Sequence, residues 1–476
     1  MRRSPWATLV VLALAQFMVV LDVTIVNVAL PGIQSDLGFS VTGLQWVISA
    51  YTLLFGGFLL LGGRAADLLG SRAVFTIGLA LFGATSLAGG LAPSPGWLIA
   101  ARAVQGLGAA LLSPAALSIV TVTFAHGRAR NIALGVWGGL AGLGGTLGVV
   151  AGGLLVDALS WRWVFFVNVP VVVLLLAITP RFVARFGPRA GERSFDLLGA
   201  VLGTGGLLAL VYGVVRAQPV GWSSPEVVGC LIGGVLLLVA FVAAEARSAA
   251  PLVPLRLLRS RTLSSAGGAL ALNGASFLST FFLVAIFLQQ VRHGSALRAG
   301  VEFLPMGGAA ILAALTATAM VNRFGTRPVQ TAGAAVSVAG LLLLSRTGAD
   351  DAYAAWLLPG LVLFGFGIIG VGVPAQIAAR ADVATAEAGA ASGVVQAFYQ
   401  VGGALGLAVV TTVSTSRADS AIAGGATPSA GLTDGFHRGL LIAAAFSVAI
   451  FLVSALSPRV APHKEQQPVD GVTVAA

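Results

Sequence analysis

The amino-acid sequence predicts an all-α integral membrane protein with 14 transmembrane helices, arranged as two six-helix pseudo-repeat bundles plus two inserted central helices. Hydrophobic residues make up 57% of the 476 residues and charged residues only 9%, whereas charged residues are about 25% of a soluble domain. The apolar residues form runs close to the roughly 20 residues that a helix needs to cross a bilayer. These runs also fall into two similar blocks of six.

Fourteen apolar runs lie between charged residues or Pro and Gly breaks. They are too long and too uniformly apolar for the alternating strands, about ten residues long, of an outer-membrane barrel. We predict spans at residues 7–30, 43–62, 73–92, 97–122, 132–156, 163–179, 196–215, 227–244, 263–289, 301–321, 329–345, 354–374, 389–412 and 438–456.

Two internal matches indicate a repeat. At a shift of 258 residues, segment 144–148 matches segment 402–406, and at a shift of 255, loop 67–72 matches loop 322–327. Weakly similar six-span halves are typical of secondary transporters, which bind substrate between the halves near the midplane. The predicted divisions are an N-terminal bundle at 1–180, two inserted helices with cytoplasmic linkers at 181–262, a C-terminal bundle at 263–457 and a cytoplasmic polar tail at 458–476.

The charge distribution predicts the orientation. Of 27 Lys and Arg residues, 19 fall on the same side as the N-terminus, 7 on the other side, and Arg102 lies within a span. Cytoplasmic loops are enriched in cations, so we predict cytoplasmic N and C termini and no nucleic-acid partner. The strong bias towards Arg and the abundance of Ala and Gly favour a bacterial source, which makes the membrane the bacterial cytoplasmic membrane.

The sequence does not predict an enzyme. Cys230 is the only cysteine, and the four histidines lack the spacing of a zinc site. Neither a nucleophile-elbow serine motif nor a nucleotide-binding loop is present. We therefore expect no metal and no cofactor.

Five segments carry recognisable patterns. They are LDVTIVNVALP at 21–31, GRAADLLGSR at 63–72, RAVQGLG at 102–108, a glycine pattern at 135–153 and WRWVFFVNVP at 161–170. Together they resemble the major facilitator superfamily, in particular its 14-span drug:proton antiporters, over residues 16 to about 456. The glycine pattern departs from the family at Val149, where proline is usual, so any kink there must come from glycine.

This resemblance implies a proton-coupled efflux transporter that exports amphiphilic drugs or antibiotics by alternating access. The proton gradient would be its energy source, and its partners would be a small amphiphilic substrate, protons and lipid, with the protein acting as a monomer. An uptake symporter, or a lipid or metabolite transporter of the same fold, is the alternative.

Three ionisable residues are candidates for proton coupling. Asp22 is the only acid deep within a predicted span, and burial of a carboxylate disfavours its charged form, as suits a site that loads and releases protons. The alternative is a structural acid bonded to Thr24 or to a neighbouring helix. Arg102 lies at a similar depth and either pairs with Asp22 or reaches towards the interface. Glu302 is either a second protonation site or an interfacial acid beside Arg298.

The cytoplasmic loop between spans 2 and 3 is a candidate conformational latch formed by Gly63, Arg64, Asp67, Gly70 and Arg72. Gly70 allows a tight turn. Asp67 is placed to meet the positive N-terminal end of span 13 when the outer side is open. An ordinary positive loop would explain the arginines but not the spacing of Asp and Gly.

Gly144, Gly148 and Gly152 recur every four residues beside Gly153. Such a smooth stripe allows close helix approach. It serves either ordinary packing or a sliding seam that also seals against proton leak.

Polar and aromatic residues within the spans are the candidates for lining a substrate cavity. A mostly apolar cavity with few acids favours amphiphilic or neutral substrates. The candidates are Asn27, Trp46, Tyr51, Gln105, Trp137, Asn273, Phe277, Gln396 and Tyr399.

Overall fold

The computed structural model describes residues 4–124, 128–184, 196–248, 251, 255–381, 383 and 388–458. These residues form helices joined by short turns, and no strand occurs among them. Within the same ranges, 12 helices are long and apolar enough to cross a membrane. Shorter apolar stretches, Leu147–Ala158 and Val201–Ala217, lie within two further long helices.

The N-terminal part of the chain folds into one group of packed helices, the N-terminal bundle. Its members are α1 (Pro5–Leu37), α2 (Val41–Leu44), α3 (Trp46–Leu69), α4 (Ser71–Gly90), α5 (Pro95–Thr123), α6 (Arg128–Ala158), α7 (Trp163–Phe166) and α8 (Asn168–Phe182). Helix α5 packs on α3 and α4, and α1 packs on α6. The start of α5 is fixed by Pro95 and by Ser94, whose hydroxyl accepts a hydrogen bond from the Trp97 backbone N–H.

The C-terminal bundle repeats this plan. It consists of α12 (Arg261–Ile286), the π-helical turn η1 (Phe287–Val291), α13 (Ala296–Phe324), α14 (Thr326–Leu344), α15 (Leu357–Ala381), α16 (Ala388–Ala423) and α17 (Pro428–Leu456). Helix α12 packs on α16, as α1 packs on α6, and α14 packs on α15. Hydroxyl caps start three of these helices, with Ser260, Ser295 and Thr427 each accepting a backbone N–H.

Both sequence matches fall at equivalent places in the two bundles. Gly70 joins α3 directly to α4 with φ 90°, and Gly325 joins α13 directly to α14 with φ 84°. These left-handed values favour glycine. Gly144 on α6 faces α1, and Gly402 on α16 faces α12.

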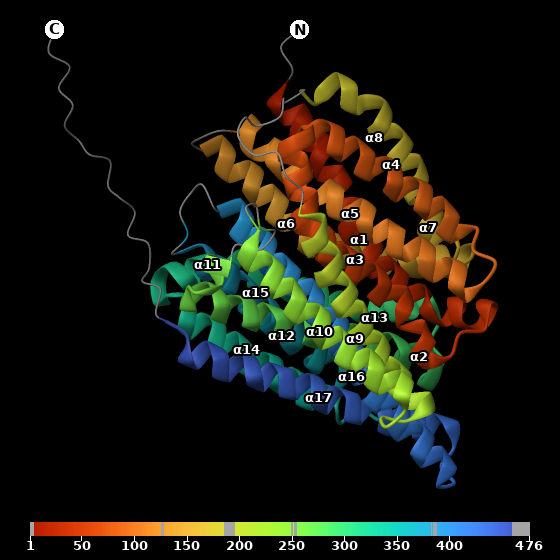
Figure 1. Ribbon diagram of the computed structural model, residues 1–476. Coiled ribbons are helices and arrows are strands. Elements are labelled where there is room, and N and C mark those ends of the chain that lie inside the picture. Colours follow the sequence, from red (N-terminus) through yellow and green to blue (C-terminus); the bar gives the residue numbers. More distant parts are fainter. Residues whose placement is uncertain are drawn as a thin grey trace, which may run out of the picture.

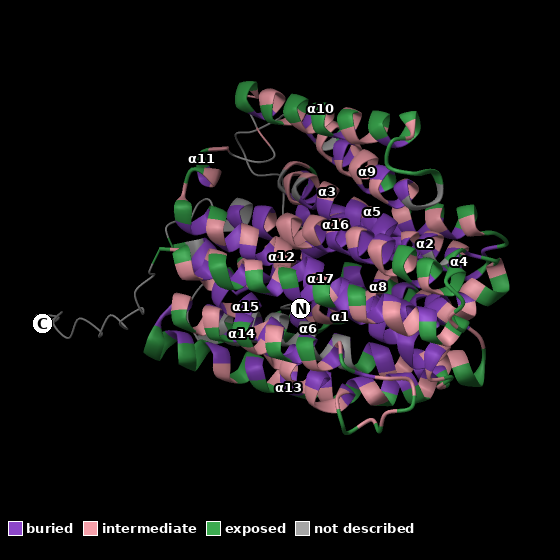
Figure 2. Cartoon of the chain, turned by 90° about the horizontal axis from the view of Figure 1, so that it is seen from below, coloured by how far each residue is buried: buried purple, intermediate pink, exposed green. Residues whose placement is uncertain are grey.

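The inserted helices lie beside both bundles. Helix α9 (Leu197–Val220) packs against α3 of one bundle and α16 of the other, and α10 (Pro225–Arg247) packs on α9. Figure 1 shows this pair crossing the front of the molecule, and Figure 2 shows α10 at the edge with much of its surface exposed. The short helix α11 (Leu255–Leu258) leads into α12. Helix α9 therefore covers the seam where α3 meets α16.

The bundles meet at the end of the molecule where α6 finishes and α13 begins, which we call the Asp157 end. The Asp157 carboxylate on α6 accepts the backbone N–H groups of Ala296 (3.1 Å) and Leu297 (2.9 Å) at the start of α13. The Gln289 amide donates to the Val28 carbonyl at 3.2 Å. A large buried apolar cluster surrounds these contacts with residues of α1, α12, η1 and α13. Polar and apolar contacts thus hold the bundles together at this end.

Several predicted spans differ from the helices at their ends. The first span was expected to end at residue 30, before Pro31, yet α1 continues to Leu37 and ends at Gly38 with φ 73°. Proline removes one backbone donor, but Leu30 and Ile33 on either side are fully buried, and this burial favours a continued helix. The span predicted at 163–179 is divided into α7 and α8, and the span predicted to end at 412 continues in α16 to Ala423.

We predict that Asp157→Ala loosens the Asp157 end. The substitution removes two hydrogen bonds that the Asp157 carboxylate accepts from backbone N–H groups at the start of α13. Spin labels at exposed Leu159 and Ala430, in a Cys230→Ala background, should report longer or broader distances between the bundles.

The control is Glu302→Gln, because the Glu302 carboxylate pairs with Arg298 within its own helix. This change should leave the distances as they are. Identical distance distributions in Asp157→Ala and the unsubstituted chain would contradict the prediction.

Candidate functional site

Asp22 and Arg102 form a buried ion pair between α1 and α5. The Asp22 side chain is 0% exposed and that of Arg102 is 1% exposed. One guanidinium nitrogen, Nη1, donates to Asp22 Oδ2 at 2.5 Å. The two ionisable groups that the predicted topology leaves unexplained are therefore in direct contact.

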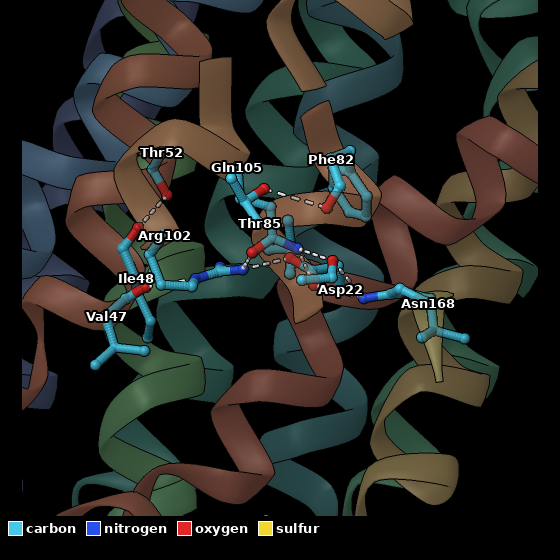
Figure 3. A network of polar contacts seen from close by, with 12 residues as sticks. Asp22, Val47, Ile48, Thr52, Phe82, Thr85, Arg102, Gln105 and Asn168 are labelled. Carbon is cyan, nitrogen blue, oxygen red and sulfur yellow. Dashed lines mark hydrogen bonds and ion pairs between the residues drawn. The ribbon is translucent and has the colours of Figure 1, made fainter. Parts of the chain in front are cut away.

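Amide groups bind the other carboxylate oxygen. Asp22 Oδ1 accepts from Gln105 Nε2 at 2.9 Å and from Asn168 Nδ2 at 3.1 Å. Ser86 Oγ on α4 accepts from the same two amides, at 2.8 Å from Gln105 and 3.4 Å from Asn168. In Figure 3, Arg102 and Asn168 approach Asp22 from opposite sides. Both carboxylate oxygens are thus satisfied by side chains of α5 and α8.

Arg102 has further partners besides Asp22. Its Nε donates to the Val47 carbonyl at 2.9 Å, and its Nη1 donates to Gln105 Oε1 at 2.8 Å. The guanidinium carbon lies 4.3 Å from the centre of the Tyr51 ring and 5.8 Å from that of Phe165, within range of a cation–π attraction. Helix α3 therefore holds the guanidinium group independently of Asp22.

The charges of ionised Asp22 and Arg102 compensate each other inside the bundle. A buried charge without a partner is costly. Addition of a proton to the carboxylate would leave the guanidinium charge unbalanced and would weaken the contact between α1 and α5. The structure thus shows a buried, charge-balanced pair that links α1 to α5.

Ser86 and Asn168 were missed by the sequence interpretation. Asn168 lies within the segment 161–170 that carries the family pattern, and a polar residue next to Pro170 in an apolar run was the available signal. Nothing in the sequence distinguishes Ser86 from other serines in spans. Gln105 and Tyr51 were predicted to line a substrate cavity, and the structure places both at the Asp22–Arg102 pair.

The other cavity candidates of the N-terminal bundle lie elsewhere. The Asn27 amide donates to the Val23 carbonyl of its own helix at 2.6 Å. The Trp46 ring lies 6.4 Å from that of Tyr212 on the inserted helix α9. The side chain of Trp137 lies outside the described residues.

The remaining cavity candidates belong to α12 and α16. Asn273 is buried, and its Oδ1 has no hydrogen-bond donor among the described residues. The Phe277 ring packs 5.8 Å from that of Phe281. Tyr399 packs on α12 at Gly274, and Gln396 is partly buried. Their role in a cavity stays a prediction.

Glu302 lies near the start of α13. Its carboxylate accepts from Arg298 Nε at 3.0 Å, and Arg298 is 63% exposed. The Tyr353 hydroxyl donates to the Glu302 backbone carbonyl at 2.6 Å. Burial, with a smaller effect of the Glu302 charge, raises the pKa of Tyr353 to about 12. This is the arrangement expected of an interfacial acid beside Arg298, and a part in proton coupling stays a prediction.

The predicted latch residues cluster at the junction of α3 and α4. Gly63 packs near Pro114 of α5, and Gly70 forms the junction itself. Arg64 and Arg72 are partly buried. The side chain of Asp67 lies outside the described residues, so its contact with α16, the helix that corresponds to span 13, stays a prediction.

The glycine stripe of α6 faces two different helices. A methyl group on Gly144 would lie 2.8 Å from Val20 of α1, and Gly148 and Gly152 face the same helix. Gly153 instead faces α13 of the other bundle, where a methyl group would lie 2.6 Å from Leu297 Cα. The stripe thus supports close packing both within a bundle and between the bundles.

Comparison with known proteins identifies the family of this chain. The family model of the Major Facilitator Superfamily matches residues 12–407. The puromycin resistance protein pur8 of Streptomyces alboniger is 42% identical over 454 residues, which cover 95% of this chain and 90% of that protein. The cephamycin export protein CmcT of Amycolatopsis lactamdurans is also 42% identical, over 86% of this chain and 85% of that protein.

Solved structures agree on the fold. The peptide transporter POT in complex with sulfate superposes with a TM-score of 0.68 at 16% identity, over 94% of each chain. A bacterial homologue of the lysosomal transporter Spinster, in an inward-facing and unoccupied conformation, gives a TM-score of 0.66 at 15% identity, over 95% of this chain and 98% of that one. The chain belongs to the major facilitator superfamily.

Proposed function

We propose that the protein is a proton-coupled exporter of amphiphilic antibiotics or drugs in the bacterial cytoplasmic membrane. The observation that carries the coupling is the buried Asp22–Arg102 pair, because its charge balance depends on one proton. Export is supported by relatives that cover most of the chain and are named for resistance to puromycin and export of cephamycin.

The proposed topology has fourteen spans and cytoplasmic termini. Helices α6 and α9, with 31 and 24 residues, are long enough to add two spans to the twelve apolar ones. The excess of cations on the side of the N-terminus supports the orientation. In this topology the Asp157 end faces outwards, so contacts gathered there correspond to an inward-facing state. The division into bundles at 1–180 and 263–457, with an insert between them, is part of the same proposal.

In the proposed cycle, one conformational change carries protons inwards and its reverse carries substrate outwards. A proton reaches Asp22 while the site is open to the outside, and it weakens the contact between α1 and α5. The protein then returns to the inward-facing state, where loss of the proton restores the ion pair. Substrate binding from the cytoplasm favours proton loss, and its release outside favours proton uptake. A symporter would instead bind substrate and proton together.

An uptake symporter, or a lipid or metabolite transporter of the same fold, is the alternative. Direction of transport separates it from export. In inverted vesicles with an acidified interior, we predict that puromycin accumulates inside, since protons that leave through an antiporter drive substrate inwards. Accumulation is measured with labelled puromycin by filtration, and an uncoupler that removes the gradient should abolish it. Efflux of preloaded puromycin driven by the same gradient would indicate symport.

The coupling role of Asp22 has its own prediction. Asp22→Asn keeps the shape of the side chain but cannot lose a proton, so gradient-driven transport should fall to the level of vesicles without the protein. Binding of puromycin to the purified variant should persist. The measurement is uptake into inverted vesicles at matched protein content.

Asp36→Asn is the matched control, because Asp36 lies on the same helix and pairs with Arg162 near the surface. It should retain gradient-driven transport. Full proton-driven uptake by Asp22→Asn would exclude Asp22 as the coupling site.

A further inference from the structure

Asn168 is a buried amide at the start of α8, and it contacts the coupling acid. The side chain is 1% exposed, and its Nδ2 lies 3.1 Å from Asp22 Oδ1 and 3.4 Å from Ser86 Oγ. The break between α7 and α8 at Val167 places it there. We propose that Asn168, supported by Ser86, positions the Asp22 carboxylate and sets the pH at which this carboxylate binds its proton. The inference rests on the proposed proton coupling.

The chemistry of an amide suits this role. An Asn side chain carries both a donor and an acceptor, whereas the guanidinium of Arg102 only donates. Asn168 donates to the ionised carboxylate through Nδ2, and its Oδ1 is able to accept from the protonated acid after rotation of the amide. A hydrogen bond to a charged acceptor is roughly twice as strong as one between neutral groups. Asn168 therefore stays a partner in both protonation states but favours the ionised one.

The groups around Asp22 allow the effect of Asn168 on its proton binding to be measured separately from that of Arg102. Arg102 faces it from α5, and Tyr51, beneath the guanidinium, is the titratable group from α3. Helix α4 contributes the neutral hydroxyl of Ser86, and α6 packs on α1 through glycine. Substitution of Asn168 removes one donor to the carboxylate and leaves Arg102 in place.

The C-terminal bundle provides a matched control. Its helices α12, α14 and α17 correspond to α1, α4 and α8. There the buried hydroxyl of Ser447 on α17 bonds to that of Ser276 on α12 at 3.2 Å and to that of Ser337 on α14 at 3.1 Å. This serine cluster holds no charged side chain. Ser447→Ala thus removes a buried hydroxyl in the same way as Ser86→Ala, without contact with Asp22.

The experiment uses the full chain in liposomes and follows puromycin–proton exchange as a function of pH. Loss of a donor to the ionised carboxylate favours the protonated form, so the midpoint should move to higher pH. We expect a rise of about one pH unit for Asn168→Leu, a smaller rise for Ser86→Ala and no change for Ser447→Ala. Infrared titration of the carboxyl band that Asp22→Asn removes should show the same shifts without transport.

Other outcomes overturn the inference. If Asn168→Leu lowers the exchange rate but leaves the midpoint pH unchanged in both measurements, Asn168 has only a structural role. A midpoint at lower pH would contradict the expected direction of the shift. Asn168→Ala, which leaves more room, serves if the leucine variant does not fold. If the unsubstituted chain exchanges no protons, the proposed function fails; if it does and the midpoint stays fixed, the positioning role alone fails.

Discussion

The N-terminal bundle is organised around the need to balance one buried guanidinium group. Arg102 is almost completely buried, and an unpaired charge there would destabilise the fold. Arg102 is bound directly by Asp22 of α1, by the Val47 carbonyl of α3 and by Gln105 of its own helix α5. Helices α4 and α8 contribute indirectly, because Ser86 and Asn168 orient the Asp22 carboxylate. Because one of these partners is a carboxylate, the proposed proton would act on the packing of α1 against α5.

The two bundles share a helix arrangement but differ in the chemistry of their interiors. The C-terminal bundle has hydrogen-bonded serines where the N-terminal bundle has an acid, a serine and an amide. The proton response proposed above therefore belongs to one bundle. The other bundle is held to it at the Asp157 end, where a carboxylate on α6 caps α13 and the η1 turn contacts α1. A change in the position of α1 or α6 would directly alter these contacts between the bundles.

The sequence predicted the helices because long apolar runs have few alternatives in a lipid environment. It also indicated the Asp22–Arg102 ion pair as one of two alternatives for Arg102, since these are the ionisable residues that the topology leaves within spans. The ends of helices were less predictable: α1 passes through Pro31 because burial on both sides outweighs the local effect of proline. Ser86 and Asn168 are not predicted as site residues because neutral polar residues occur in many spans. Which of them face one acid depends on helix rotation and on the break between α7 and α8.

In the proposed cycle, substrate binding and protonation of Asp22 oppose one another. The direct measurement is the number of protons released when puromycin, the probe for the proposed substrate class, is added to the purified protein in weakly buffered detergent solution, at the midpoint pH of exchange, where part of the Asp22 carboxylates carry a proton. We expect a measurable acidification for the unsubstituted chain and none for Asp22→Asn, with substrate bound in both. Equal proton release by the two proteins would contradict this coupling through Asp22.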